Sequence, residues 1–177
     1  MSVLGIDEVT FAATDLARCR QFMLDWGMNL VSESAQEMVF ETLNGCRVIV
    51  ADPTTPGLPP GVEADPTVRE VVWGVQDEAD LQRFGQAMRK QPGYMQTTGR
   101  FGCTDPNGLA VRVQVTRKKE VAPACAQTNT WNERTRINQA SPAYDRATPI
   151  EVGHVVFFVT DLAATSVPPN AADVPSS

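Results

Sequence analysis

The sequence contains no apolar run that approaches the roughly 20 residues needed to cross a bilayer. Its apolar content of 42% and its charged content of 20% are those of ordinary globular proteins. The first residues, Met-Ser-Val-Leu-Gly-Ile-Asp, carry an acid where a secretory signal needs a basic start and an apolar stretch. We therefore expect a cytoplasmic protein with no membrane partner.

Positive charge and paired cysteines are also scarce. The chain has 15 Lys and Arg against 21 Asp and Glu, a net charge of −6, and its one basic cluster is the short run 117–119. Because nucleic-acid binding depends on a Lys/Arg surface, we expect no nucleic-acid partner. The four cysteines form no CxxC motif, so neither a zinc site nor a disulfide framework is indicated. We expect all four to be reduced, buried thiols: Cys19, Cys46, Cys103 and Cys125.

An internal repeat is the most informative feature that is present. Segment 5–16 aligns without gaps on segment 151–162, and a weaker copy occupies 68–77. Each copy alternates as a strand does and leads to a residue that can cap a helix. Three residues take equivalent positions in the copies: Glu8, Glu70 and His154.

The first two copies each begin a β-α-β-β-β unit. The first is followed by a helical pattern and by strand-like runs at 28–33, 37–43 and 46–51. The second, a strand at 68–75, is followed by a helix that begins near Asp77 and by strand-like runs at 94–98, 101–104 and 109–116. We predict an α+β fold in which residues 3–116 form paired βαβββ units, with a cupped mixed sheet and helices on its outer face.

The same patterns predict which side chains face the core. In the first strand, one face should carry Ile6, Glu8, Thr10 and Ala12, and the other Val9, Phe11 and Ala13. The helix that follows has an apolar stripe that we expect to pack on the sheet: Leu16, Cys19, Phe22, Met23 and Trp26.

Beyond residue 116 the periodicity is lost. Residues 117–149 are predicted to form an irregular connector, because prolines are scattered among polar residues there. The third copy predicts that 150–162 is the first strand of a second, incomplete module. The Ala/Ser/Pro-rich stretch 163–177 is expected to be a disordered tail.

Paired βαβββ units resemble the vicinal oxygen chelate superfamily, which includes glyoxalases, bleomycin-resistance proteins and extradiol dioxygenases. The segment Asp105-Pro106-Asn107-Gly108-Leu109-Ala110-Val111-Arg112 is similar to a family pattern that ends in a metal-binding glutamate. The resemblance implies Fe(II) or Mn(II) in full-length relatives, and it makes Glu8, Glu70 and Arg112 the metal positions of the first module.

Those positions depart from a metal site, because a guanidinium is permanently protonated and cannot be a ligand. We interpret Arg112 as an ion-pair partner of Glu8 and Glu70 that replaces the metal. Weak metal binding by the two carboxylates and unrelated surface placement are the alternatives. His154, the sole histidine, matches the first-ligand position of a second module whose co-ligands are absent. This chain alone should therefore bind no metal and carry no catalytic residue.

The resemblance implies the N-terminal, non-catalytic module of an extradiol-type ring-cleavage dioxygenase acting on catecholic aromatics. The alternative is a metal-free small-molecule binding protein of the bleomycin-resistance type, for which Trp73 and Phe101 are candidate pocket residues. A third possibility is assembly. The strand at 152–160 is apolar on both faces, so we expect a homo-oligomer, such as a homodimer, that covers it.

Overall fold

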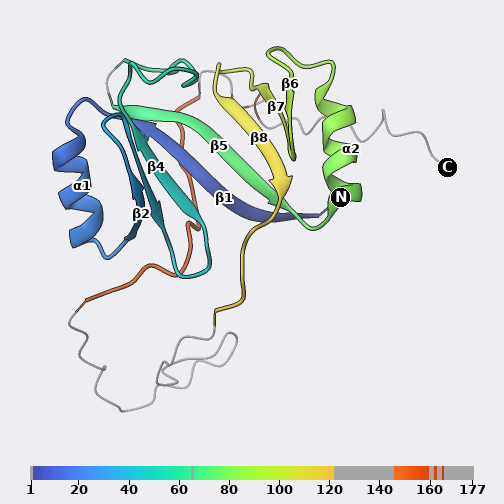
Figure 1. Ribbon diagram of the computed structural model, residues 1–177. Coiled ribbons are helices and arrows are strands. Elements are labelled where there is room, and N and C mark those ends of the chain that lie inside the picture. Colours follow the sequence, from blue (N-terminus) through green and yellow to red (C-terminus); the bar gives the residue numbers. More distant parts are fainter. Residues whose placement is uncertain (1, 65, 122–145, 160–161, 163–164, 166–177) are drawn as a thin grey trace.

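The computed structural model describes residues 2–64, 66–121, 146–159, 162 and 165 (Figure 1). Two helices are present in these residues, α1 (Leu16–Asp25) and α2 (Glu78–Met88). The strands of the first unit are β1 (Val3–Ala12), β2 (Asn29–Glu33), β3 (Glu37–Glu41) and β4 (Arg47–Ala51). Those of the second are β5 (Thr67–Val75), β6 (Met95–Thr97), β7 (Arg100–Thr104) and β8 (Ala110–Val115). The predicted succession of strands and helices is confirmed.

One mixed sheet holds all eight strands, in the order β2-β3-β4-β1-β5-β8-β7-β6. Within each unit the first strand pairs in parallel with the last, β1 with β4 and β5 with β8. The two units meet where β1 runs antiparallel to β5, so each half of the sheet repeats the other. The predicted pairing of two βαβββ units is therefore confirmed, and Figure 1 shows the curved sheet that they build.

Both helices cover the same face of this sheet, one over each half (Figure 1). The side chains of Asp15 and Asp77 cap them by accepting a hydrogen bond from the third amide along the chain, Arg18 N and Asp80 N. Under α1 lies an apolar cluster that includes Met38, Phe40, Val48 and Val50. Under α2 lies a second cluster that contains Val75, Leu81, Phe101 and Val113.

The predicted stripe of α1 is wrong at two residues. Phe22 and Trp26 are 60% and 61% exposed, and their rings lie 5.9 Å apart on the surface. Successive helical residues are about 100° apart, so the positions of Leu16, Cys19 and Met23 face the sheet while Phe22 lies on the flank. Trp26 already lies in the cap that follows the helix.

A second correction concerns Ile6. The register between β1 and β5 shifts between Ile6 and Glu8, which leaves Asp7 as an extra residue on β1. Ile6 therefore joins Val9 in an apolar cluster on the helix-bearing face, whereas Glu8 and Thr10 stay on the opposite face. We call that opposite face, which carries Glu8, Thr10, Glu70 and Arg112, the helix-free face.

Residues 146–159, here called the return segment, lie against the helix-bearing face. The carbonyl oxygens of Pro149 and Ile150 accept hydrogen bonds from the amides of Leu43 and Asn44, and Val152 and Val155 pack on the apolar clusters. The predicted strand at 152–160 is not formed over 152–159, because these residues have no strand neighbour in the described part of the chain. That 150–162 begins a second module remains a prediction. The expected tail at 163–177 lies outside the described residues, apart from Thr165.

No helix among the described residues is both long and apolar enough to span a membrane.

Candidate site on the helix-free face

Three adjacent strands, β1, β5 and β8, bring the predicted site residues together. Glu8 lies on β1, Glu70 on the neighbouring β5, and Arg112 on β8, next to Val72 of β5. Val72 pairs with both Glu8 and Arg112 and lies two residues from Glu70 on β5. Because paired residues and strand residues two apart share a face, all three side chains belong to the helix-free face. The structure thus places Glu8, Glu70 and Arg112 on one face, but the partners that it gives them differ in part from those expected.

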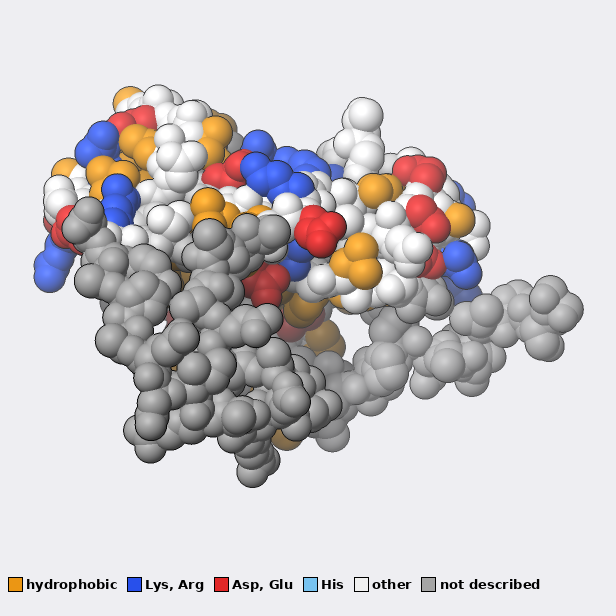
Figure 2. All heavy atoms as spheres, turned by 90° about the horizontal axis from the view of Figure 1, so that it is seen from below, with side chains coloured by type: hydrophobic (Ala, Val, Ile, Leu, Met, Phe, Trp, Pro, Cys, Tyr) orange, Lys and Arg blue, Asp and Glu red, His pale blue; other side chains and the backbone are white. Residues whose placement is uncertain are grey.

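Glu8 binds two arginines that sequence analysis did not identify. Arg100 Nη1 and Nη2 donate to its two carboxylate oxygens at 3.0 and 3.1 Å, and Arg117 Nη2 donates to Oε2 at 2.7 Å. The side chain of Glu8 is 5% exposed, against 29% for Arg100 and 38% for Arg117. The carboxylate is therefore enclosed beneath its cations. Figure 2, which shows the molecule from below, has Lys and Arg side chains next to acidic ones in the middle of that view.

Arg112 pairs with Glu70 and not with Glu8. Its Nε lies 3.1 Å from Glu70 Oε2, and its Nη1 donates to the carbonyl oxygens of Cys103 and Val111. Gly102, on the neighbouring β7, leaves the space that the arginine occupies, since a Cβ there would lie 2.2 Å from Arg112 Cδ. Every recorded partner of the Arg112 side chain is thus provided by the sheet itself.

The two carboxylates differ in their electrostatics. Burial alone would raise the pKa of Glu8, but the hydrogen bonds and charges of Arg100 and Arg117 outweigh burial and hold that pKa below its ordinary value. For Glu70, burial outweighs the attraction of Arg112 and Arg100, and the charge of Glu8 adds to it, so its pKa is raised. The attraction of these two arginines thus does not offset the burial of Glu70.

A third buried carboxylate, Asp7, fixes the end of the sheet. It accepts hydrogen bonds from Gln114 Nε2 and Thr116 Oγ1, both at 2.8 Å, and from the backbone amide of Arg117 at 3.0 Å. Asp7 therefore holds the backbone of Arg117 while Glu8 holds its guanidinium. The absence of a Cβ at Gly74 makes room for this carboxylate, because that atom would lie 2.3 Å from Asp7 Oδ1.

These residues do not fit a metal ion. In the described residues, no three His, Cys, Asp or Glu side chains are grouped so that they could hold one. Arg112 occupies the third predicted position, and each carboxylate already has an arginine partner. His154 is exposed on the return segment, on the other side of the sheet from Glu8 and Glu70.

The two aromatic candidates do not form a pocket together. Phe101 is 5% exposed and packs under α2 with Leu81 and Val113, so its prediction as a pocket residue is wrong. Trp73 is partly exposed on β5, next to Ile6 of β1, on the helix-bearing face.

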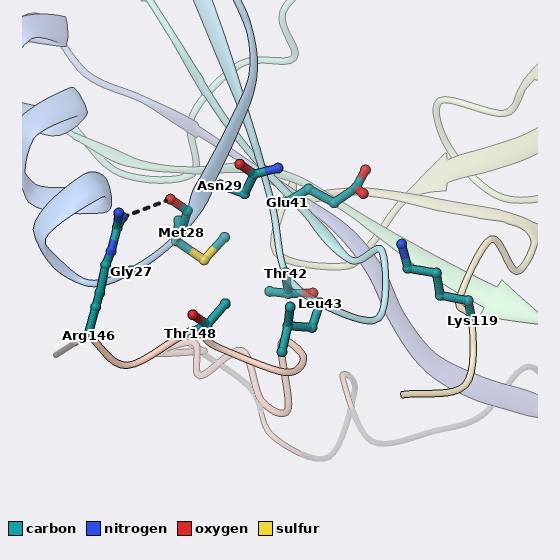
Figure 3. Close-up of a pocket in the computed structure, with 9 residues that line it drawn as sticks. All are labelled: Gly27, Met28, Asn29, Glu41, Thr42, Leu43, Lys119, Arg146 and Thr148. Atoms are coloured by element: carbon teal, nitrogen blue, oxygen red, sulfur yellow. Dashed lines mark hydrogen bonds between the residues drawn. The ribbon is translucent and has the colours of Figure 1, made fainter. Parts of the chain in front are cut away.

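Two surface pockets lie away from the helix-free face. One of about 130 Å³ is lined by residues near the start of β5, by the turn before β8 and by residues 156–159 of the return segment. The other, of about 340 Å³, lies where the turn after α1, the β3–β4 hairpin and the return segment meet (Figure 3).

Compared by sequence, the chain matches no family profile and no curated protein. Solved structures do match its fold. A halotolerant catechol dioxygenase, BphC, aligns with a TM-score of 0.61 and 14% identity over 92% of this chain and 52% of that one. A Mn(II)-bound glyoxalase from Novosphingobium aromaticivorans gives 0.48 and 17%, over 68% and 42%. Homoprotocatechuate 2,3-dioxygenase from Brevibacterium fuscum gives 0.49 and 14%, over 67% and 34%.

The fold of this chain is therefore similar to that of the catechol dioxygenase, and its paired βαβββ units are those that the sequence predicted. At these identities the likeness concerns the fold alone. The chain spans between about a third and about a half of the length of these three structures.

Proposed function

We propose that this chain is the N-terminal, non-catalytic module of an extradiol-type ring-cleavage dioxygenase. The observation that carries the proposal is the pairing of both central carboxylates with arginine, Glu8 with Arg100 and Arg117, and Glu70 with Arg112. Ion pairs at these positions occupy both carboxylates and leave no open coordination positions for a substrate. Support for the reaction class comes from the fold of the catechol dioxygenase, about half of which this chain spans.

The proposal assigns the metal to a second module that begins at the return segment. Its support is the sequence repeat, which aligns His154 with Glu8 of β1. Fe(II) or Mn(II) held by that second module would provide the chemistry that joins a catecholic substrate to dioxygen. The paired charges on the helix-free face of the first module serve only to support the fold.

Turnover by the chain on its own tests this function. Purified protein incubated with Fe(II) or Mn(II), oxygen and a panel of catechols should give no ring-cleavage product, measured by absorbance. Steady turnover by these 177 residues, lost in Glu8→Gln or Glu70→Gln, would overturn the assignment of a non-catalytic module. His154→Ala should have no effect on this chain but should abolish iron binding in a longer chain that includes the second module.

The alternative, a metal-free binding protein of the bleomycin-resistance type, is supported less well. It requires aromatic residues around a ligand, but Phe101 lies in the core and Trp73 lines neither of the two pockets described above. Calorimetric titration with planar aromatic glycopeptides separates the two functions. Saturable binding that is lost in Trp73→Ala would favour the alternative.

A further inference from the structure

The pocket of about 340 Å³ has a chemistry that the helix-free face does not share. It is lined by the turn after α1, by the β3–β4 hairpin, by Lys119 and by two residues of the return segment, Arg146 and Thr148 (Figure 3). We propose that this pocket binds a small organic carboxylate whose body is a single ring or of similar size. This function is independent of the proposed dioxygenase module, because the pocket contains none of the residues that pair on the helix-free face.

The charges of the pocket favour an anion. Two cations, Lys119 and Arg146, line it together with one acid, Glu41. That acid already has a partner, because Arg47 Nε lies 3.3 Å from Glu41 Oε2. The Lys119 ammonium has no recorded hydrogen bond or ion pair in the described part of the chain. The pocket thus carries excess positive charge in a chain whose net charge is −6.

Arg146 is held in place before any ligand arrives. Its Nη2 donates to the carbonyl oxygens of Leu24 and Met28, at the end of α1 and in the turn that follows. These carbonyls lie at the negative end of the helix dipole, which attracts a cation. The remaining N–H groups of the guanidinium have no recorded partner in the described residues, and a guanidinium edge matches the geometry of a carboxylate.

The backbone of the turn after α1 allows this close approach. Gly27 has φ +96°, and a Cβ there would lie 1.8 Å from the carbonyl oxygen of Ala147. The return segment can therefore lie directly on the turn, which places Arg146 at the wall of the pocket. Any side chain at residue 27 would push the segment, and Arg146 with it, away from α1.

The remaining lining suits a small body with an apolar part. Leu43, which is 40% exposed, and Met28, which is buried at the pocket wall, make part of the lining apolar. Asn29, Thr42 and Thr148 provide polar groups. Figure 3 shows Arg146 and Lys119 on opposite sides, with Thr42, Leu43 and Thr148 between them. A volume of 340 Å³ is at the lower end of the range for ligand pockets, about 300–1,000 Å³, which excludes large ligands. The carboxylate should bind at Arg146, and Lys119 should add attraction from a distance.

Benzoate is the probe for the test, and benzamide is its neutral control of the same shape. In calorimetric titrations of the intact chain, benzoate should bind saturably and benzamide at least about tenfold more weakly, since a charge-assisted contact is worth about a factor of ten. Backbone amide shifts in NMR should move at Gly27, Thr42 and Leu43. Equal binding of the two probes, no saturable binding of benzoate, or shifts confined to other elements would each overturn the proposal.

Three variants complete the test. Arg146→Met should weaken benzoate binding about tenfold or more, and Lys119→Met less, with an effect that added salt reduces. Arg146→Lys keeps the charge and should bind benzoate better than Arg146→Met does. The matched control is Lys90→Met, which removes one exposed positive charge just beyond α2. An equal loss in Lys90→Met and Arg146→Met would show that only net charge matters and would contradict the site.

Discussion

Replacing Glu8 with Gln should lower the free energy of unfolding by about 1–3 kcal/mol at neutral pH. Arg100 and Arg117 donate three hydrogen bonds to the two carboxylate oxygens. Glutamine keeps only one acceptor oxygen and has no charge, so at least one of these bonds is lost and those that remain are each weaker by about 1 kcal/mol. Both arginines are about a third exposed, so water replaces part of what they lose, and the full cost of breaking a buried pair does not apply.

Glu70→Gln should cost less than about 1 kcal/mol under the same conditions. The pKa of Glu70 is raised by burial, so the folded protein already disfavours its charge. The amide oxygen of glutamine can still accept a hydrogen bond from Arg112, which keeps two carbonyl partners of its own.

The pH dependence of the two carboxylates has opposite sign. Because the folded pKa of Glu8 is lowered, its contribution to stability is present above the unfolded pKa, about 4.3, and is lost as the pH falls through the folded pKa. The folded pKa of Glu70 is raised, so its contribution is present below the unfolded pKa and is lost as the pH rises through the folded value. The deficit of the Glu8→Gln variant should therefore shrink on acidification.

Urea unfolding followed by circular dichroism, at neutral pH and near pH 4, measures these differences. Glu41→Gln is the matched control, because Glu41 pairs with Arg47 in a more exposed position and should cost at most about 1 kcal/mol. The reasoning would be refuted if Glu70→Gln destabilised the protein more than Glu8→Gln did. A deficit of the Glu8 variant that grew as the pH fell would refute it equally.

Three further substitutions test the packing. In an exposed helix, Gly→Ala would stabilise the protein by about 1 kcal/mol. Gly85→Ala should instead destabilise it by about 1–3 kcal/mol, because the new Cβ would lie 2.7 Å from the ring of Phe101. A variant that is stabilised in urea unfolding would contradict the core position of Phe101. Gly102→Ala should cost about 1–3 kcal/mol by displacing Arg112, and less when Glu70 is already Gln; full additivity of the two changes would argue against the contact. Val156 and Phe158 are 85% and 92% exposed, so replacing both with Ser should change the free energy of unfolding by no more than about 0.5 kcal/mol. If the chain assembles through this segment, the same change should lower the mass found by light scattering. An unchanged mass would count against that assembly.

The fold could be predicted because its signals are local and are repeated. Strand alternation and the helix caps at Asp15 and Asp77 each act within a few residues, and the duplication allowed one unit to check the other. The strand expected at 152–160 shows the limit of this reasoning. A strand needs a neighbour, and none lies beside residues 152–159 in the described part of the chain.

The partners in the candidate site could not be predicted because they are distant in sequence. Arg100 and Arg117 lie 92 and 109 residues from Glu8, and no spacing rule connects such positions. In the sequence, Arg117 is only the first residue of the short basic run 117–119. The extra residue at Asp7, which reverses the expected face of Ile6, likewise depends on pairing with β5 and leaves no mark on β1 itself.

The metal content of the purified chain tests most directly the claim that arginine pairs replace a metal on the helix-free face. After incubation with Fe(II) or Mn(II) and removal of free ions, elemental analysis should find far less than one metal ion per chain, with no change in Glu8→Gln or Glu70→Gln. One ion per chain that either substitution removes would contradict the account, because Glu8 and Glu70 would then be ligands and not the partners of Arg100, Arg117 and Arg112.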